Sequence, residues 1–298
     1  QSLMNNILSI VTLFLLMVPA FATTINIPGD YATIQDGIEA ASDGDTVLVY
    51  PGSYYGPIDF LSKNLVLGSL YLLEENESHI YETVLLNDDF QLSNFVSISS
   101  AQYSELNGFT FQEIVLNSGG DEPQALININ LSSPSIINNR FNNSYLFSGG
   151  ESAFIYCENS SSLIMNNEFT NCSVGNGYVL GGYILSKNSS LTIKNNRIEN
   201  GYVGFAEPSG YIVSVNSEDI IESNIIINTS MGYCWVCAVI SILDESNCTI
   251  RNNLIFQAYG DGYGAVVASE SLYISNNNTF VYNGMGYANL SSDGTVSN

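Results

Sequence analysis

The stretch LTIKNNRIEN, residues 191–200, interleaves isoleucine with asparagine. Isoleucine favours β-strands, whereas asparagine is typical of turns, because its side chain competes with the backbone for hydrogen bonds. Such a mixture can belong to a binding site, a glycosylation target or a piece of scaffold. The rest of the chain decides between these interpretations, because the same pattern recurs in it.

The recurring pattern has an isoleucine three residues before a central asparagine and a phenylalanine or isoleucine two residues after it. Five copies follow one another at steps of 28 or 29 residues, and a looser sixth copy comes after them. A period of this length indicates a repeat architecture. The central asparagines of the five copies are Asn139, Asn167, Asn196, Asn224 and Asn253.

Each repeat also holds a second apolar run, about 12 residues before the central asparagine, such as ALINI at 125–129 and GYIVS at 210–214. Two short strands, a Gly/Tyr-rich connection and no convincing helix fit one coil of a parallel β-helix, and do not fit leucine-rich or ankyrin units. Successive coils of such a fold lie about 4.8 Å apart. We therefore expect stacked apolar columns inside, and a structural ladder of the central asparagines that turns the chain in the left-handed conformation and bonds along the axis.

Length and composition favour one large all-β domain. The chain has 298 residues, of which 45% are apolar and only 12% are charged, about half the usual charged share. Its 29 acidic and 6 basic residues leave a net charge of −23. This charge excludes nucleic acid as a partner, which needs lysine and arginine, and it repels an anionic polysaccharide unless a cation intervenes.

Residues 1–22 predict a secretory signal peptide, because an apolar run ends in the small-x-small motif Ala-Phe-Ala. A membrane anchor is the alternative, which Pro19 and the cleavage motif disfavour. No later segment is long and apolar enough to cross a membrane. We expect a secreted, extracellular or cell-surface protein whose mature part is a single β-helix domain at 23–298, with no membrane span.

Five cysteines follow the predicted cleavage point, so at least one is unpaired if any disulfide forms. Buried thiols, one disulfide and a metal site are the three alternatives, and the single CxxC motif is weak evidence for redox or zinc chemistry. These residues are Cys157, Cys172, Cys234, Cys237 and Cys248.

The N-terminal segment INIPGDYATIQDGIEAASDGDTVLVYPGSYYGPIDF, residues 25–60, resembles the start of right-handed parallel β-helix proteins of the pectin-lyase-like superfamily, in its secreted bacterial branch. The resemblance implies a capping segment at 25–46, followed by coils to about residue 290. Within that segment we expect Thr33 to cap a short helix that plugs the open end of the solenoid. We expect loops at 74–81 and 112–124, and further sequence beyond residue 298.

The resemblance does not select an activity, because the superfamily contains lyases, hydrolases, esterases, epimerases, adhesins and proteins of unknown role. Its known catalytic motifs do not carry over to this sequence residue by residue. We therefore name no catalytic residue.

An acidic corner is the first candidate site. Acidic residues lie between the two strand runs of three successive coils, where carboxylates and asparagine amides can supply the six to eight oxygen ligands of Ca²⁺. A solvated corner is the alternative interpretation. The candidate metal ligands are Glu218, Asp219, Asp244, Glu245 and Glu270.

Aromatic side chains in the Gly-rich connections are the second candidate site. Rings with a polar handle suit stacking on sugars or protein contact, although an internal aromatic stack that closes the core is the alternative. The candidate binding residues are Tyr178, Tyr202, Tyr233, Trp235, Tyr259 and Tyr263.

The leading hypothesis is a monomeric, non-catalytic protein that binds a polysaccharide or another cell-surface component. A Ca²⁺-assisted polysaccharide lyase or glycoside hydrolase acting on pectin-like substrates is a second hypothesis. A structural stalk or adhesin passenger is the third.

Overall fold

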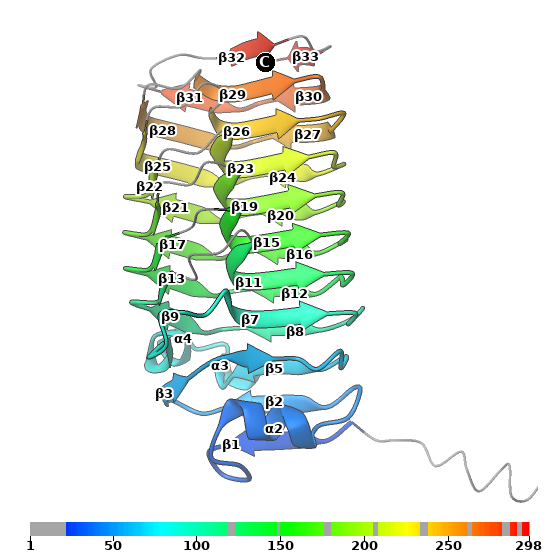
Figure 1. Cartoon of the computed structure of the whole chain (residues 1–298), viewed down its shortest axis with the longest axis vertical. Helices are drawn as coiled ribbons and strands as arrows, with labels where there is room; N and C mark the ends of the chain where they lie inside the picture. The colour runs from blue at the N-terminus through cyan, green and yellow to red at the C-terminus, as the bar shows by residue number, and fades with distance from the viewer. Residues whose placement is uncertain are drawn as a thin grey trace, which may run out of the picture.

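The computed structural model describes residues 22–117, 123–147, 150–175, 180–204, 208–232, 238–260, 264–281, 287–290 and 294–297. These residues wind into a solenoid whose coils stack along the long axis of the molecule (Figure 1). Strands of successive coils pair in parallel within three sheets, called sheets A, B and C. The structure thus confirms the predicted all-β parallel β-helix.

Each sheet collects one side of every coil. Sheet A contains β1 (Thr24–Ile27), β2 (Thr46–Val49), β5 (Val66–Ser69), β8 (Glu105–Asn107), β12 (Ser135–Ile137), β16 (Leu163–Met165), β20 (Thr192–Lys194), β24 (Ile220–Glu222), β27 (Asn247–Arg251), β30 (Leu272–Asn276) and β33 (Gly294–Ser297). Sheet B contains β3 (Gly52–Tyr55), β6 (Thr83–Leu86), β9 (Thr110–Gln112), β10 (Val115–Leu116), β13 (Arg140–Asn142), β14 (Tyr145–Leu146), β17 (Glu168–Thr170), β18 (Ser173–Val174), β21 (Arg197–Glu199), β22 (Tyr202–Val203), β25 (Ile225–Met231), β28 (Leu254–Gly260) and β31 (Thr279–Val281). Sheet C contains β4 (Ile58–Asp59), β7 (Asn94–Ser99), β11 (Gln124–Asn130), β15 (Ser152–Glu158), β19 (Gly181–Lys187), β23 (Ser209–Val215), β26 (Ala238–Leu243), β29 (Gly264–Ser269) and β32 (Tyr287–Leu290).

The core consists of columns of equivalent side chains. Phe111, Phe141 and Phe169 occupy one position of sheet B in successive coils, and their rings stack with centroids 4.8 and 4.4 Å apart. Ile136 and Ile164 pair in the same way in sheet A and are fully buried. The in-register stacking follows from the constant repeat length, because one residue inserted into a strand would turn its inward side chains outward.

The short helix α2 (Ile34–Ala40) closes the N-terminal end of the solenoid (Figure 1). The Thr33 side chain caps it by accepting a hydrogen bond from the backbone N–H of Asp36 at 3.1 Å. Ile34 and Ile38 are buried against the first coil. This arrangement agrees with the expected plug, and the cap satisfies one of the free N–H groups at the helix start.

The asparagine ladder lies at the corner between sheets A and B, where the five central asparagines are buried. The residue in the left-handed conformation is, however, the one before each central asparagine, for example Asn195 with φ 55° and Asn166 with φ 57°. The prediction that Asn196 itself turns the chain was therefore wrong. The left-handed residue directs its side chain outward, so the next asparagine is free to point into the core.

A second ladder, made of serines, lies at the corner between sheets C and A. The backbone N–H of Ser160 donates to Oγ of Ser189 at 3.0 Å, and that of Ser189 donates to Oγ of Ser217 at 3.1 Å. Each of these corners begins with a left-handed residue, as Asn188 does with φ 50°. The serine spacing of 28 or 29 residues was visible in the sequence, but serine is too frequent in this chain for the pattern to stand out.

One coil departs from the pattern between sheets A and B. Residues 70–82 form two short helices there, α3 (Tyr71–Glu74) and α4 (Ser78–Glu82), in place of a tight corner. The loop expected at 74–81 is therefore largely helical. Figure 1 shows α4 just below β9, with α3 beside it.

The described residues include only some of the predicted cysteine and membrane features. Cys157, Cys172 and Cys248 are buried free thiols, and burial raises the pKa of Cys172 and of Cys248 to about 12. Cys234, Cys237 and residues 1–21 lie outside the described residues. No helix in the described ranges is both long enough and apolar enough to span a membrane.

Candidate functional site

The acidic corner contains a long, open groove at the junction of sheets C and A. The groove has a volume of about 540 Å³ and runs across four successive coils. Two of the predicted acids, Glu218 and Glu245, lie in it. Its other lining residues are amides and hydroxyls, namely Asn159, Ser160, Ser161, Asn188, Ser189, Ser190, Asn216 and Ser217. We call this surface the corner groove.

The left-handed corner residues build the corner groove. Asn159, Asn188 and Asn216 have φ values of 52°, 50° and 48°, and all three are exposed. Nδ2 of Asn216 donates to Oδ1 of Asn188 at 2.7 Å, so these two amides are joined along the solenoid axis. The groove therefore offers hydrogen-bond donors and acceptors that recur once per coil.

Asp219 does not belong to the exposed acidic corner, contrary to the prediction. Its side chain is 1% exposed, and it accepts hydrogen bonds from Ser186 Oγ at 3.0 Å, Ser214 Oγ at 2.6 Å and the backbone N–H of Leu191 at 2.7 Å. Desolvation by burial raises the pKa of this carboxyl to about 6, although the three hydrogen bonds oppose the shift. The reason is local, since alternate residues point to opposite faces and Glu218 takes the outward position.

The remaining predicted metal ligands lie at exposed turn positions. Asp244 and Glu245 are consecutive left-handed residues, and the backbone N–H of Glu245 donates to the carbonyl of Glu270 at 2.8 Å. Within the described ranges, no three acidic, histidine or cysteine side chains are grouped closely enough to hold a metal ion. The five acids thus divide between the core, the groove and the neighbouring turns, and do not form the expected cluster.

All six basic side chains of the chain are engaged with other groups. The ammonium of Lys63 donates to three backbone carbonyls at the end of α2, those of Ile38, Glu39 and Ala41. The other five make ion pairs, namely Arg140–Glu168, Lys187–Glu151, Lys194–Glu222, Arg197–Glu199 and Arg251–Glu222. None of the six lines the corner groove.

A second cavity lies between the helices α3 and α4 and the strands of later coils, at the corner between sheets A and B. It has a volume of about 310 Å³. Its lining residues come from these helices and from two later coils, namely Tyr71, Glu77, Ile80, Tyr81, Asn138, Asn139, Arg140, Asn166 and Glu168. We call it the helix pocket.

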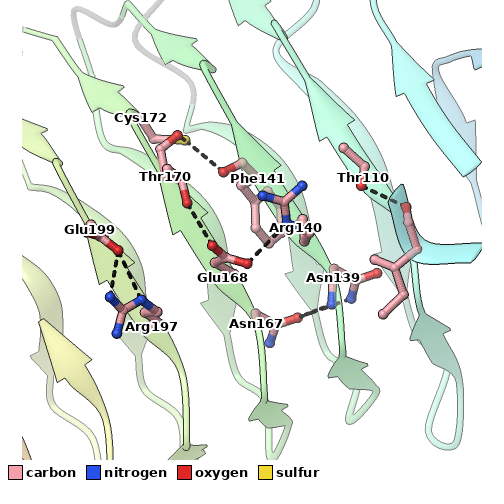
Figure 2. A network of polar contacts seen from close by, with 11 residues as sticks. Thr110, Asn139, Arg140, Phe141, Asn167, Glu168, Thr170, Cys172, Arg197 and Glu199 are labelled. Atoms are coloured by element: carbon pink, nitrogen blue, oxygen red, sulfur yellow. Dashed lines mark hydrogen bonds and ion pairs between the residues drawn. The ribbon is translucent and has the colours of Figure 1, made fainter. Parts of the chain in front are cut away.

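Arg140 is the central charged residue of the helix pocket. Its guanidinium carbon lies 4.3 Å from the centroid of the Tyr81 ring, and its Nε donates to Oε2 of Glu168 at 3.1 Å, as Figure 2 shows. The contact with Tyr81 was missed because that tyrosine lies in a segment expected to be a loop.

Most of the predicted aromatic surface lies outside the described residues. This applies to Tyr178, Tyr233, Trp235 and Tyr263, and the side chain of Tyr259 is not described either. Tyr202 is 37% exposed. Other aromatic residues, led by Phe154, Tyr183 and Tyr211, form a buried internal stack with centroids 5.0 and 4.9 Å apart.

The comparisons with known proteins concern the fold. A family model described as "Right handed beta helix region" matches residues 100–298, and a search of curated proteins found no match. The structure is similar to the pectin methylesterase from carrot, with 12% identity, a TM-score of 0.46 and coverage of 92% of this chain and 88% of that one. It is also similar to the pectin methylesterase from Aspergillus niger, with 13% identity, a TM-score of 0.48 and coverage of 92% and 87%.

Proposed function

The chain belongs to the right-handed β-helix family, and from this premise we propose that it is a secreted or cell-surface protein that binds carbohydrate without cleaving it. The observation that carries the proposal is the corner groove. It presents the amides of Asn159, Asn188 and Asn216 together with serine hydroxyls and two carboxylates. Amide, hydroxyl and carboxylate groups are the hydrogen-bond partners that sugar hydroxyls require.

The shape and the charge of the groove favour an extended, neutral polysaccharide. Equivalent groups recur at the strand spacing of about 4.8 Å, so a polymer with a regular repeat can meet the same donors and acceptors on several coils. Glu218 and Glu245 in the groove disfavour an anionic chain, as does the net charge of −23. The proposed aromatic binding residues, including Tyr202, remain part of this proposal as an additional stacking surface.

The pairing of the basic residues disfavours a lyase. A lyase needs a base beside the substrate, and general acid–base catalysis needs a group within hydrogen-bond reach of the reacting atom. The lysines and arginines are held in ion pairs or by helix carbonyls, and the groove contains none of them. The groove offers binding groups in a wide, open setting.

The proposal is tested by measuring retention of the full chain on immobilised neutral polysaccharides. Soluble polygalacturonate is the anionic polysaccharide for comparison. We expect a neutral polysaccharide to be bound, and Asn188→Gly to weaken its binding about tenfold through loss of amide hydrogen bonds. Glycine keeps the left-handed backbone at this position. Asn195→Gly is the matched control, because Asn195 is also exposed and left-handed but lies at the other corner.

Three results would contradict the proposal. The first is a chain that retains no neutral polysaccharide, and the second is an equal effect of Asn188→Gly and Asn195→Gly on binding. The third is release of products from a bound polysaccharide that disappears in Glu245→Ala, which would show an enzyme. Repeating the retention measurement with a chelator separates direct recognition of the polysaccharide from Ca²⁺-mediated recognition. We expect the chelator to leave retention unchanged.

A further inference from the structure

We propose that the helix pocket is a second binding site, which takes a single neutral sugar ring or a similar polyol. It lies at the corner between sheets A and B, whereas the corner groove lies between sheets C and A. The two sites share no lining residue. The assignment therefore stands on its own side chains and not on the groove.

The helices that line the pocket pack against the solenoid. The hydroxyl of Thr110 donates to the carbonyl of Ile80 at 2.7 Å (Figure 2), and Ile80 is 8% exposed. At the other helix, a Cβ on Gly108 would come within 3.1 Å of the Tyr71 Cβ, which shows how closely the two segments pack. These contacts support a preformed hollow, as ligand sites generally are.

Arg140 presents unused hydrogen-bond donors to this hollow. Its Nε is bound to Glu168, and its guanidinium is held against the ring of Tyr81. Neither of its two Nη atoms makes a hydrogen bond within the described structure. A guanidinium immobilised in this way loses little rotamer entropy when it binds a ligand oxygen, because its planar fork is already in place.

Acceptors lie beside these donors. Nδ2 of Asn138 donates to Oδ1 of Asn107 at 3.0 Å, and Nδ2 of Asn166 donates to Oδ1 of Asn138 at 3.2 Å. This outer row of amides stops at Asn166, whose Oδ1 accepts no hydrogen bond among the described residues. Exposed Glu77 adds a carboxylate to the lining. Donors and acceptors side by side match the vicinal hydroxyls of a sugar.

The aromatic rings and the charge balance select a neutral ring over other ligands. Tyr81 is 49% exposed even though Arg140 covers part of it, and Tyr71 lines the pocket beside it, so ring surface is available for stacking. Arg140 is neutralised by Glu168, and Glu77 leaves a negative excess that disfavours a carboxylate or sulfate. A volume of about 310 Å³ lies at the lower end of the range for small-molecule sites, which favours one ring over a chain.

The test is a titration of the full chain with methyl hexopyranosides of the gluco, galacto and manno series, in which NMR chemical shifts of the protein report binding. Galacturonate and inorganic sulfate serve as anionic probes in the same measurement. We expect saturable binding of at least one neutral hexoside and none of the anions. Tyr81→Ala and Arg140→Gln should each weaken binding about tenfold or more, because each removes stacking or charged hydrogen bonds.

Arg197→Gln is the matched control. Arg197 occupies the next coil of the same outward column as Glu168, pairs with Glu199 in its own strand and lies outside the pocket. Asn188→Gly, which alters only the corner groove, should also leave hexoside binding unchanged. Arg140→Lys keeps the charge but loses the planar fork, so it should behave like Arg140→Gln.

The proposal fails if no neutral hexoside binds, if galacturonate or sulfate binds better, or if Arg140→Gln and Arg197→Gln have equal effects. A thermal midpoint within the range of the control variants shows that each substituted chain is folded. Because Asn188→Gly reports on the groove and Tyr81→Ala on the pocket, failure of one site is distinguishable from failure of the other.

Discussion

The side-chain Oδ1 of Asn196 accepts two hydrogen bonds from Asn167, one from its backbone N–H at 3.0 Å and one from its Nδ2 at 3.1 Å. Nδ2 of Asn196 in turn donates to the carbonyl of Ile164 at 2.9 Å. The same set of bonds joins the other central asparagines, for example Asn224 and Asn253. Each asparagine therefore satisfies buried polar groups of the coil before it, and the ladder is continuous.

The first prediction concerns this ladder. Asn196→Ala removes both acceptor contacts and leaves buried N–H groups of Asn167 without a partner. Each unsatisfied buried group costs about 1–3 kcal/mol, so the free energy of unfolding should fall by about 4 kcal/mol. Urea denaturation of the two chains measures the difference.

Asn195→Gly is the control for the ladder prediction. Asn195 is exposed and has φ 55°, a conformation that glycine adopts without strain. The stability change should stay within about 0.5 kcal/mol. Equal destabilisation by the two variants would mean that the corner conformation, and not the buried ladder, holds the coils together.

The second prediction concerns the pH dependence caused by Asp219. Its pKa is about 6 in the folded chain, compared with an ordinary value of 3.8. The folded state therefore binds this proton more tightly than the unfolded state, so the stability contribution is present below about pH 4 and is lost as the pH rises to about 6. Asp219→Asn should remove that loss.

Unfolding midpoints of the wild type and Asp219→Asn, compared at several pH values, check this prediction. The stability of the variant relative to the wild type should increase by roughly 3 kcal/mol between pH 3.5 and pH 7. The comparison cancels the other carboxylates, which titrate in both chains. A constant difference across this range would show that folding does not raise the pKa of Asp219.

The third prediction concerns the packing of α3 on the solenoid. Gly108 has φ 82°, and a Cβ there would meet Oγ of Ser69 at 2.6 Å and Cβ of Tyr71 at 3.1 Å. Gly108→Ala should therefore lower stability by about 3 kcal/mol through strain and overpacking. Gly44→Ala is the matched control, because Gly44 has φ 90° with nothing within 4 Å of a Cβ, and it should cost about 1 kcal/mol. Equal costs in thermal unfolding would show that α3 is not packed closely.

The fourth prediction concerns the end of the capping helix. The Lys63 ammonium donates to the carbonyls of Ile38, Glu39 and Ala41 at 2.8, 2.7 and 2.8 Å. Lys63→Met should lower stability by about 2 kcal/mol, because it leaves these carbonyls without their charged donor, and should speed amide exchange in α2. Lys194→Met, which removes a surface pair with an N–O distance of 3.8 Å, should change stability by less than about 0.5 kcal/mol. Unchanged exchange in α2 would contradict the capping role.

The solenoid could be predicted from the sequence because the pattern that specifies it is local and recurs in every coil. A period of 28 or 29 residues with isoleucine and asparagine at fixed offsets specifies which side chains stack, whatever the connections do. It could not tell which of two adjacent asparagines turns the chain. Asn195 and Asn196 have the same chemistry, and only the backbone path assigns the left-handed conformation to one and burial to the other.

The candidate sites were less predictable, because they depend on direction and on contacts between distant segments. Glu218 and Asp219 look like one acidic pair in the sequence, yet adjacent residues face opposite sides of the chain, and only one of them reaches solvent.

By itself, the sequence determined the class of fold, the coil length and the buried columns, since these follow from residue spacing alone. Only the tertiary structure brought the guanidinium of Arg140 over the ring of Tyr81, because the stacking of coils places a helix of one coil beside the strands of later ones. No local sequence pattern predicts that contact or the helix pocket to which it belongs.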